Sequence, residues 1–175
     1  MRVKVIGKQK NSTQCVGCRP DSPLGTMRYY NLENGYALGM FNLSKNYVSY
    51  PGTIHGGITA TFLDELLCRC HVVGGENMWG VTKEMTIRYR RPVPPEIDLF
   101  GVSKITSMDE KSFTSRAWLL SEEGEILAEG RSSYVKFNDH RMKKFGMDKK
   151  HMILLNDDED PKYIDIPDEI LNAKD

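Results

Sequence analysis

Residues 55–73, HGGITATFLDELLCRCHVV, place two glycines before an apolar stretch that carries an acid, Asp64, near its middle. If the stretch is a helix, the N–H groups of its first turn lack internal partners and lie at the positive end of the dipole. Gly56 and Gly57 would let a carbonyl oxygen approach those N–H groups, which is the geometry of an oxyanion hole. A plain turn with His55 near the cap of a weak helix start is the alternative.

The apolar residues of 56–73 cover about half of a helical wheel, which predicts a helix buried along much of its circumference. Glu65 and Arg69 lie four positions apart and are predicted to pair. Asp64 has no basic residue three or four positions away. Two interpretations stay open for Asp64: an exposed surface position, or a carboxylate in a cleft where partial desolvation tunes its basicity.

Strand-like segments flank this helix on both sides. The Asn34-Gly35 pair predicts a hairpin with a type I′ turn. Gly74-Gly75 is predicted to end the helix. The expected strands are residues 26–32 and 36–43 before the helix, and 79–93, 97–108, 112–121 and 125–137 after it. One helix covers one face of such a sheet, so we expect an α+β fold with a curled antiparallel sheet around one long central helix. Apolar residues on both faces of the late strands predict at least a dimer.

The chain divides into three predicted parts. Residues 1–23 form an irregular N-terminal arm, residues 24–137 form the folded domain, and residues 138–175 form a partly helical, acidic tail. The like-charge run at 156–161 is predicted to be solvated or disordered. We expect a chain that ends near Phe137 to fold without the tail.

Charge and hydropathy exclude several partners. The chain has 24 Lys and Arg against 24 Asp and Glu, which gives no overall attraction to nucleic acid or to membrane surfaces. It has no apolar run of about 18 residues, so no membrane span is expected. Because the N-terminus lacks the pattern of a secretory signal, we predict a cytoplasmic protein.

The four cysteines are too few for a disulfide scaffold in a chain of 175 residues. Cys15-x-x-Cys18 is half of a zinc site, and Cys68, Cys70 and His71 are the remaining candidates. Cys68 and Cys70 lie about 200° apart on the helical wheel, which disfavours a shared metal. A structural arm is favoured over zinc and over a redox pair, and we expect no metal and no cofactor.

Over about residues 24–137 the sequence resembles the hotdog-fold acyl-CoA thioesterases, of the type related to the phenylacetate-pathway thioesterase and the mammalian thioesterase-superfamily members. The resemblance rests on GTIHGGITATFLDELL, GVTKEMTIRYRRPV and EGEILAEGRSSYVKF. The arm CVGCRPDSPLG is similar to a lead-in of some members. The resemblance implies an acyl-CoA substrate, a homodimer or dimer of dimers with sheets joined edge to edge, and active sites at the dimer interface.

The same resemblance implies a role for each motif residue. Asp64 matches the helix acid that acts as general base on water or as nucleophile. The N–H of Gly57, or of Gly56, matches the donor that polarises the thioester carbonyl, and His55 matches the histidine that helps to place the thioester. Thr82 matches a residue that orients the water and reaches the site from the other subunit.

Two further groups have open assignments. Ser49 stands where some relatives carry an asparagine that holds the water, and Asn46 is a substitute one turn earlier. Arg88, Arg90 and Arg91 follow one another at the end of a predicted strand. They form either a solvated strand face or contacts to the phosphates of CoA, for which forked guanidinium donors are well suited.

The predicted function is hydrolysis of an acyl-CoA thioester to free acid and CoA. One alternative is a hotdog hydratase or dehydratase that recruits His55 and Asp64 around an enoyl thioester. The other is an acyl-CoA-binding module without catalysis. An acyl- and enoyl-CoA panel, followed by thiol release and enoyl absorbance, discriminates the three.

Overall fold

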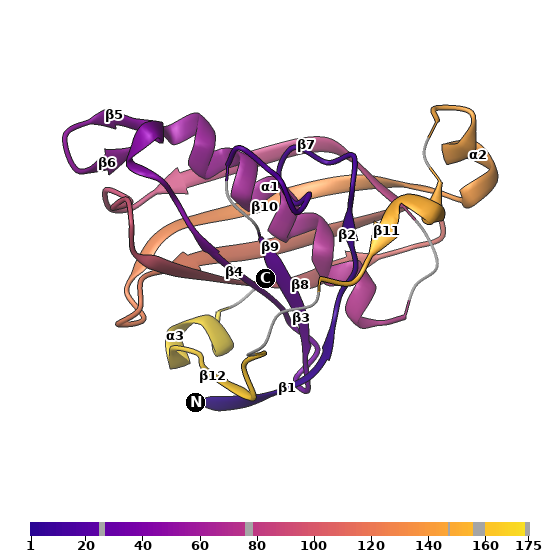
Figure 1. Cartoon of the computed structure of the whole chain (residues 1–175). Helices are drawn as coiled ribbons and strands as arrows, with labels where there is room; N and C mark the ends of the chain where they lie inside the picture. The colour runs from indigo at the N-terminus through magenta and orange to yellow at the C-terminus, as the bar shows by residue number, and fades with distance from the viewer. Residues whose placement is uncertain (25–26, 76–78, 147, 156–159, 174–175) are drawn as a thin grey trace.

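The computed structural model describes residues 1–24, 27–75, 79–146, 148–155 and 160–173. Its main sheet has eight strands, paired antiparallel in the order β12-β1-β3-β4-β8-β9-β10-β7, and the long helix α1 (Gly56–Val73) packs against it (Figure 1). The strands are β1 (Arg2–Lys8), β3 (Arg28–Leu32), β4 (Ala37–Asn42), β7 (Trp79–Tyr89), β8 (Asp98–Met108), β9 (Ser112–Leu120), β10 (Ile126–Phe137) and β12 (Tyr163–Asp165).

Shorter elements complete the description. Two small ribbons pair β2 (Asn11–Ser12) with β11 (Met152–Ile153), and β5 (Val48–Tyr50) with β6 (Thr53–Ile54). The short helical turns are η1 (Lys45–Tyr47), α2 (Asp139–Lys143), η2 (Lys149–His151) and α3 (Asp168–Leu171). Residues 156–159, which hold most of the predicted like-charge run, lie outside the described residues.

The predicted helix and the predicted strands on either side of it are confirmed, and the turn at Gly35 refines one of them. Gly35 has φ +83° and donates its N–H to the Leu32 carbonyl, while the Leu32 N–H donates to Tyr36. Among the described non-glycine residues only Glu96 has a positive φ. The hairpin therefore closes through a three-residue loop with Gly35 left-handed, and not through the predicted type I′ turn, which needs two positive φ values.

Close helix–sheet packing depends on two facing glycines. Gly39 on β4 and Gly101 on β8 are register partners, and Leu66 of α1 lies over both. A Cβ atom on Gly101 would lie 2.3 Å from Leu66 Cδ2. The absence of side chains at these two positions lets the helix approach the sheet directly, and Phe62 stacks on Phe41 beside them with ring centroids 4.5 Å apart.

Part of the opposite face of the sheet is covered by the chain's own tail. Trp118 and Val102 point away from α1 and form a second core with Ile166 and Ile170, which are 1% and 0% exposed. In Figure 1 the yellow end of the chain returns to the N-terminal strand, where β12 pairs with β1. The tail is thus part of the folded unit, which argues against the expectation that a chain ending near Phe137 folds without it.

The N-terminal arm also differs from the expectation of irregular structure. Residues 2–8 form β1, which pairs with β3 on one side and with β12 on the other. Sequence reasoning missed this strand because its partners lie far away along the chain. The apolar residues on the second face of β9, exemplified by Trp118, meet tail residues, so their presence no longer requires a second copy of the chain.

Candidate active site

Asp64, from the middle of α1, and Thr82, from β7, meet at a cleft. The Thr82 hydroxyl donates to Asp64 Oδ1 over 3.0 Å. Both residues line a cavity of about 630 Å³ whose walls come from the N-terminal arm, α1, β7 and the η2–β11 segment. Of the two interpretations of Asp64, the structure supports the half-buried carboxylate in a cleft. Thr82 approaches Asp64 of its own chain, whereas the resemblance implied an approach from the other subunit.

Electrostatics distinguish Asp64 from the thiol beside it. Partial burial raises the pKa of Asp64; the hydrogen bond from Thr82 opposes this rise, and the charge of Glu65 adds to it. Burial raises the pKa of the Cys68 thiol to about 12. Cys68 lines the same cleft but stays protonated near neutral pH. The acid, and not this thiol, is therefore the group suited to activate a nucleophile.

The start of α1 is capped by His55. Its Nδ1 atom accepts a hydrogen bond from the Gly57 N–H over 2.9 Å, and its carbonyl accepts from Ile58 and Thr59. Gly57 was the first choice for the carbonyl donor, yet its N–H already has an acceptor. Within the described part of the chain, the Gly56 N–H is the helix-start donor that has no protein acceptor. The Tyr89 hydroxyl donates to the Gly56 carbonyl over 2.8 Å and ties the end of β7 to this turn.

Asn46 and Ser49 lie beside the helix start and outside the Asp64 cleft. Asn46 belongs to η1 and Ser49 to β5, and both are exposed. The neighbouring Tyr47 carbonyl accepts the His55 N–H over 2.8 Å, which fixes this segment against the helix start. Neither residue is positioned to hold a water against Asp64 of the same chain.

The three arginines at the end of β7, of which Arg88 lies in the strand and Arg90 and Arg91 follow it, have carboxylate partners. Arg90 donates through two nitrogens to Glu129, at 3.2 and 2.7 Å, and Arg91 pairs with Glu125 at 2.7 Å. Arg88 lies 4.0 Å from Glu129, and its side chain is 74% exposed. None of the three lines the Asp64 cleft. The basic residues that do are Lys8, Lys10, Arg69 and Lys149.

The predicted site residues therefore form two groups. His55 and the glycines lie at the start of α1, with Asn46 and Ser49 beside them; Asp64 and Thr82 lie at the cleft. Asp64 lies seven positions after Gly57 on the α-helix, which corresponds to about 10 Å along the axis. One chain does not bring both groups to the same small substrate atom.

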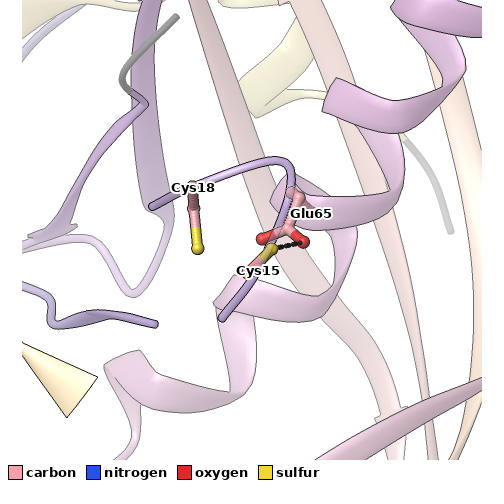
Figure 2. Close-up of side chains that lie close together, drawn as sticks. All are labelled: Cys15, Cys18 and Glu65. Carbon is pink, nitrogen blue, oxygen red and sulfur yellow. Dashed lines mark hydrogen bonds between the residues drawn. The ribbon is translucent and has the colours of Figure 1, made fainter. Parts of the chain in front are cut away.

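A cluster of two thiols and a carboxylate borders the cleft, and sequence reasoning missed its third member. Figure 2 shows Cys15 and Cys18 of the arm facing Glu65 of α1. The Cys15 thiol donates to Glu65 Oε1 over 2.8 Å. Glu65 was predicted to pair with Arg69, which is confirmed at 3.7 Å. The Cys-x-x-Cys motif is visible in the sequence, but no local signal indicates which helix turn lies beneath the arm.

Comparisons with known proteins agree with this fold. The family model described as "Thioesterase superfamily" matches residues 51–128. A crystal structure of a thioesterase superfamily protein superposes with a TM-score of 0.63 at 26% identity, over 69% of this chain and 59% of the other. A hypothetical thioesterase from Streptococcus pneumoniae, solved with coenzyme A, superposes with a TM-score of 0.58 at 14% identity, over 65% of this chain and 87% of the other. The α+β hotdog fold is confirmed.

Two curated relatives match a shorter part of the chain. An uncharacterised mitochondrial protein of Candida albicans is 33% identical over 64 residues, which cover 37% of this chain and 29% of the relative. An uncharacterised mitochondrial membrane protein of Saccharomyces cerevisiae is 33% identical over 66 residues, which cover 37% of this chain and 27% of the relative. Both names contradict the predicted cytoplasmic location. That prediction rested on composition and on the first residues, which do not specify a compartment. No helix within the described ranges is long and apolar enough to cross a membrane.

Proposed function

We propose that this chain, a hotdog-fold protein of the thioesterase superfamily, hydrolyses an acyl-CoA thioester to a free acid and CoA. The observation that carries the proposal is the Asp64–Thr82 hydrogen bond at the cleft. Thr82 occupies one carboxylate oxygen and fixes its orientation, so the second oxygen is left to accept a proton from water. The names of the two curated relatives favour mitochondria as the place of this activity.

The chemistry requires few groups. Asp64 removes a proton from water while the water oxygen attacks the thioester carbonyl carbon. The carbon–sulfur bond then breaks, and CoA leaves as a thiolate that takes up the proton. Thiolate is a good leaving group, so the reaction needs no full catalytic triad. Direct attack by Asp64 to form a mixed anhydride is the second route that the same carboxylate permits.

The carbonyl oxygen needs an N–H donor at about 3 Å, and the helix start of the same chain lies about 10 Å from Asp64. We therefore place the helix start of a second copy against the Asp64 cleft of the first. In the described chain β7 pairs with β10 and is the last strand of the sheet. Its outer edge offers unpaired backbone groups for an edge-to-edge homodimer or a dimer of dimers. The Gly56 N–H is the first candidate donor; Gly57 serves only if His55 turns away.

A CoA ester suits the charge of the cleft. The S. pneumoniae relative was solved with coenzyme A, and here three lysines and Arg69 line the cavity beside Asp64. Among the three arginines at the end of β7, Arg88 is the first candidate for a CoA phosphate, because its side chain is the most exposed of the three. Ser49 and Asn46 are candidates for contact with the substrate at the helix-start side of the composite site.

A panel of acyl- and enoyl-CoAs tests the reaction, with free thiol and enoyl absorbance both recorded. We expect Asp64→Asn to lower kcat by at least about a hundredfold, as loss of general-base catalysis does, with little change in stability. Asp21→Asn, at an acid with 83% of its side chain exposed, is the matched control. Loss of enoyl absorbance without thiol release would identify a hydratase. Tight binding of a CoA ester with neither thiol release nor loss of enoyl absorbance would identify a binding module. A folded, fully active Asp64→Asn enzyme refutes the proposal.

Mixed dimers test the composite site. Gly56→Pro removes the open N–H at the first helical position, where proline is tolerated. A dimer of one Asp64→Asn chain and one Gly56→Pro chain keeps one intact site if each site combines two chains. It keeps none if each site lies within one chain. We expect activity in the mixed dimer that exceeds the activity of either parent. If the chains are shown to have exchanged and the mixed dimer is no more active than its parents, the composite arrangement is contradicted. An active Gly56→Pro homodimer would assign the N–H donor to Gly57.

A further inference from the structure

The cluster of Cys15, Cys18 and Glu65 has the composition of a metal site. One ligand atom from each residue lies within 4.8 Å of the other two. In tetrahedral zinc sites the metal lies about 2.3 Å from sulfur and about 2.0 Å from oxygen, which places neighbouring ligand atoms about 3.5 to 3.8 Å apart. Small rotations of the side chains therefore bring the three atoms onto one ion. Two of the ligands come from the arm and the third from α1, fifty residues away.

The fold holds the arm against this turn of α1. Gly17, between the cysteines, packs directly on Glu65, and a Cβ atom there would lie 2.9 Å from Glu65 Cγ. The Asn11 side chain donates to the carbonyls of Cys18 and Met27, both at 2.6 Å. The Arg19 N–H donates to the Cys15 carbonyl over 3.0 Å and closes the turn. The convergence of the three ligands is thus built by the backbone and does not depend on the thiols alone.

Charge supplies an independent argument. Arg69 is buried; it donates to Cys18 Sγ over 3.1 Å and to the Lys10 carbonyl over 2.6 Å. Two thiolates and a carboxylate carry three negative charges, and Arg69 carries one positive charge. A divalent cation balances these charges, so the group is neutral with the metal bound, as it also is when both thiols are protonated. Binding therefore leaves no unpaired charge in a half-buried site. Donors such as Arg69 commonly orient the thiolate ligands of a metal.

We propose that Cys15, Cys18 and Glu65 bind one Zn²⁺ ion, with the fourth coordination position open to the cleft that holds Asp64. Binding exchanges the two thiol protons, released to solvent, for two zinc–sulfur bonds. Two thiolates select zinc over magnesium or calcium, which prefer oxygen ligands. The ion would clamp the arm to α1 beside the proposed catalytic acid. The metal site does not rest on thioester hydrolysis.

Zinc is favoured over a redox pair by the third ligand. A Cys15–Cys18 disulfide would use the two sulfurs and give no role to the carboxylate that Gly17 holds against them. Cys18 is only 1% exposed, which also hinders attack by an external thiol or oxidant. The two possibilities make opposite predictions about free thiols and bound metal, so one set of measurements separates them.

The test is metal content and metal affinity of the whole chain, purified without chelator and kept reduced. We expect about one zinc per chain, a zinc-dependent rise in Tm, and thiolate-to-metal charge-transfer absorption when Co²⁺ is added. Competition between the protein and a chromophoric chelator gives the Zn²⁺ affinity. Cys15→Ser and Glu65→Gln should weaken it at least tenfold. Cys68→Ser and Cys70→Ser remove thiols from the same helix and should leave it unchanged. Asp64→Asn should retain zinc, which keeps this result separate from hydrolysis.

Several outcomes would overturn the proposal. One is a reduced protein that is free of zinc and gives no charge-transfer band with Co²⁺. Another is an unchanged zinc affinity in Cys15→Ser. A third is the loss of both arm thiols to a disulfide without metal. Cys18→Ser is not needed for the decision, because Cys18 is buried and its substitution also tests folding. Cys15 is half-buried, so Cys15→Ser tests metal binding with less effect on folding. Glu65→Gln also removes the ion pair with buried Arg69, so its result is compared with that of Cys15→Ser.

Discussion

Ile170 provides a direct test of whether the tail belongs to the folded unit. Its side chain is fully buried against the face of the sheet opposite α1, in the cluster that contains Trp118 and Val102. Replacing a buried isoleucine by alanine removes apolar contacts and leaves a cavity, at a cost of about 2–5 kcal/mol. A chain of this size has a total stability of about 5–15 kcal/mol, so Ile170→Ala removes a large fraction of it.

Urea unfolding followed by tryptophan fluorescence measures the change, because Trp118 lies in the same cluster. For a chain of this length the loss corresponds to a fall in Tm of roughly 4 to 20 °C. Ile6→Ala makes the same deletion at a side chain that is 60% exposed, and we expect a change of less than about 1 kcal/mol. If Ile170→Ala is no more destabilising than Ile6→Ala, the tail does not contribute to the core as argued.

Four further changes have defined outcomes. Gly101→Ala forces a methyl group onto Leu66 and should lower the free energy of unfolding, measured in urea, by about 1–3 kcal/mol. Gly7→Ala, whose Cβ would lie 3.7 Å from Asn31, should lower it less. Equal losses would contradict the packing argument. Burial alone would raise the pKa of Glu129, but hydrogen bonds from Arg116 and Arg90 outweigh it and hold that pKa below its usual value. The ionised form therefore stabilises the fold above about pH 4, and this contribution is lost as the pH falls through the lowered pKa. Glu129→Gln should flatten that part of the curve of unfolding free energy against pH. An unchanged curve would mean that Glu129 does not contribute to this pH dependence. Thr82→Val deletes a hydrogen bond to a carboxylate worth about 1.5–3 kcal/mol, so kcat should fall roughly tenfold to a hundredfold. The fold should persist. Full activity would exclude an orienting role for Thr82. Met152→Ala widens the cleft on the β11 side and should change how KM varies with acyl-chain length. Leu154→Ala, at a side chain that is 51% exposed and outside the cleft, should not change it. If the two variants give the same KM profile, the acyl group binds elsewhere.

The helix and the strands around it could be predicted because their signals are local. Hydrophobic periodicity, glycine and proline positions, and the Asn34-Gly35 turn are properties of neighbouring residues. The strand β1 could not be predicted in the same way. Its pairing with β12 joins Arg2 to Asp165, and such a contact depends on where the whole chain returns. The type of the hairpin turn was also beyond the pattern, because Asn34-Gly35 is compatible with more than one loop length.

In the candidate site, too, local features could be predicted from the sequence and contacts between distant segments could not. The missing helical partner of Asp64 left an exposed position and a cleft position both open, and the structure places this acid in a cleft beside Thr82. The sequence placed His55 near the cap of the helix start, but it did not predict the hydrogen bond that the side chain makes, because a histidine at this position is compatible with several rotamers. The His55 ring accepts the Gly57 N–H, so the expected donor to the substrate carbonyl becomes the Gly56 N–H. The partner of Cys15 was missed for a similar reason, since Glu65 already had an apparent partner in Arg69.

The walls of the cleft explain why the shared fold specifies a reaction better than a substrate. Asp64 and Thr82 lie within residues 51–128, which match the superfamily. The opposite wall is built by the arm, with Lys8 and Cys15, and by the tail, with Lys149 and Met152. These segments lie outside the matched region, and β2–β11 pairing joins them to each other over the cleft. The residues proposed to activate water are therefore held by the common helix and sheet. The residues that would meet the proposed acyl-CoA substrate come from segments that the family pattern does not constrain. Under the proposed function, the choice of acyl group would accordingly be set by the arm and the tail.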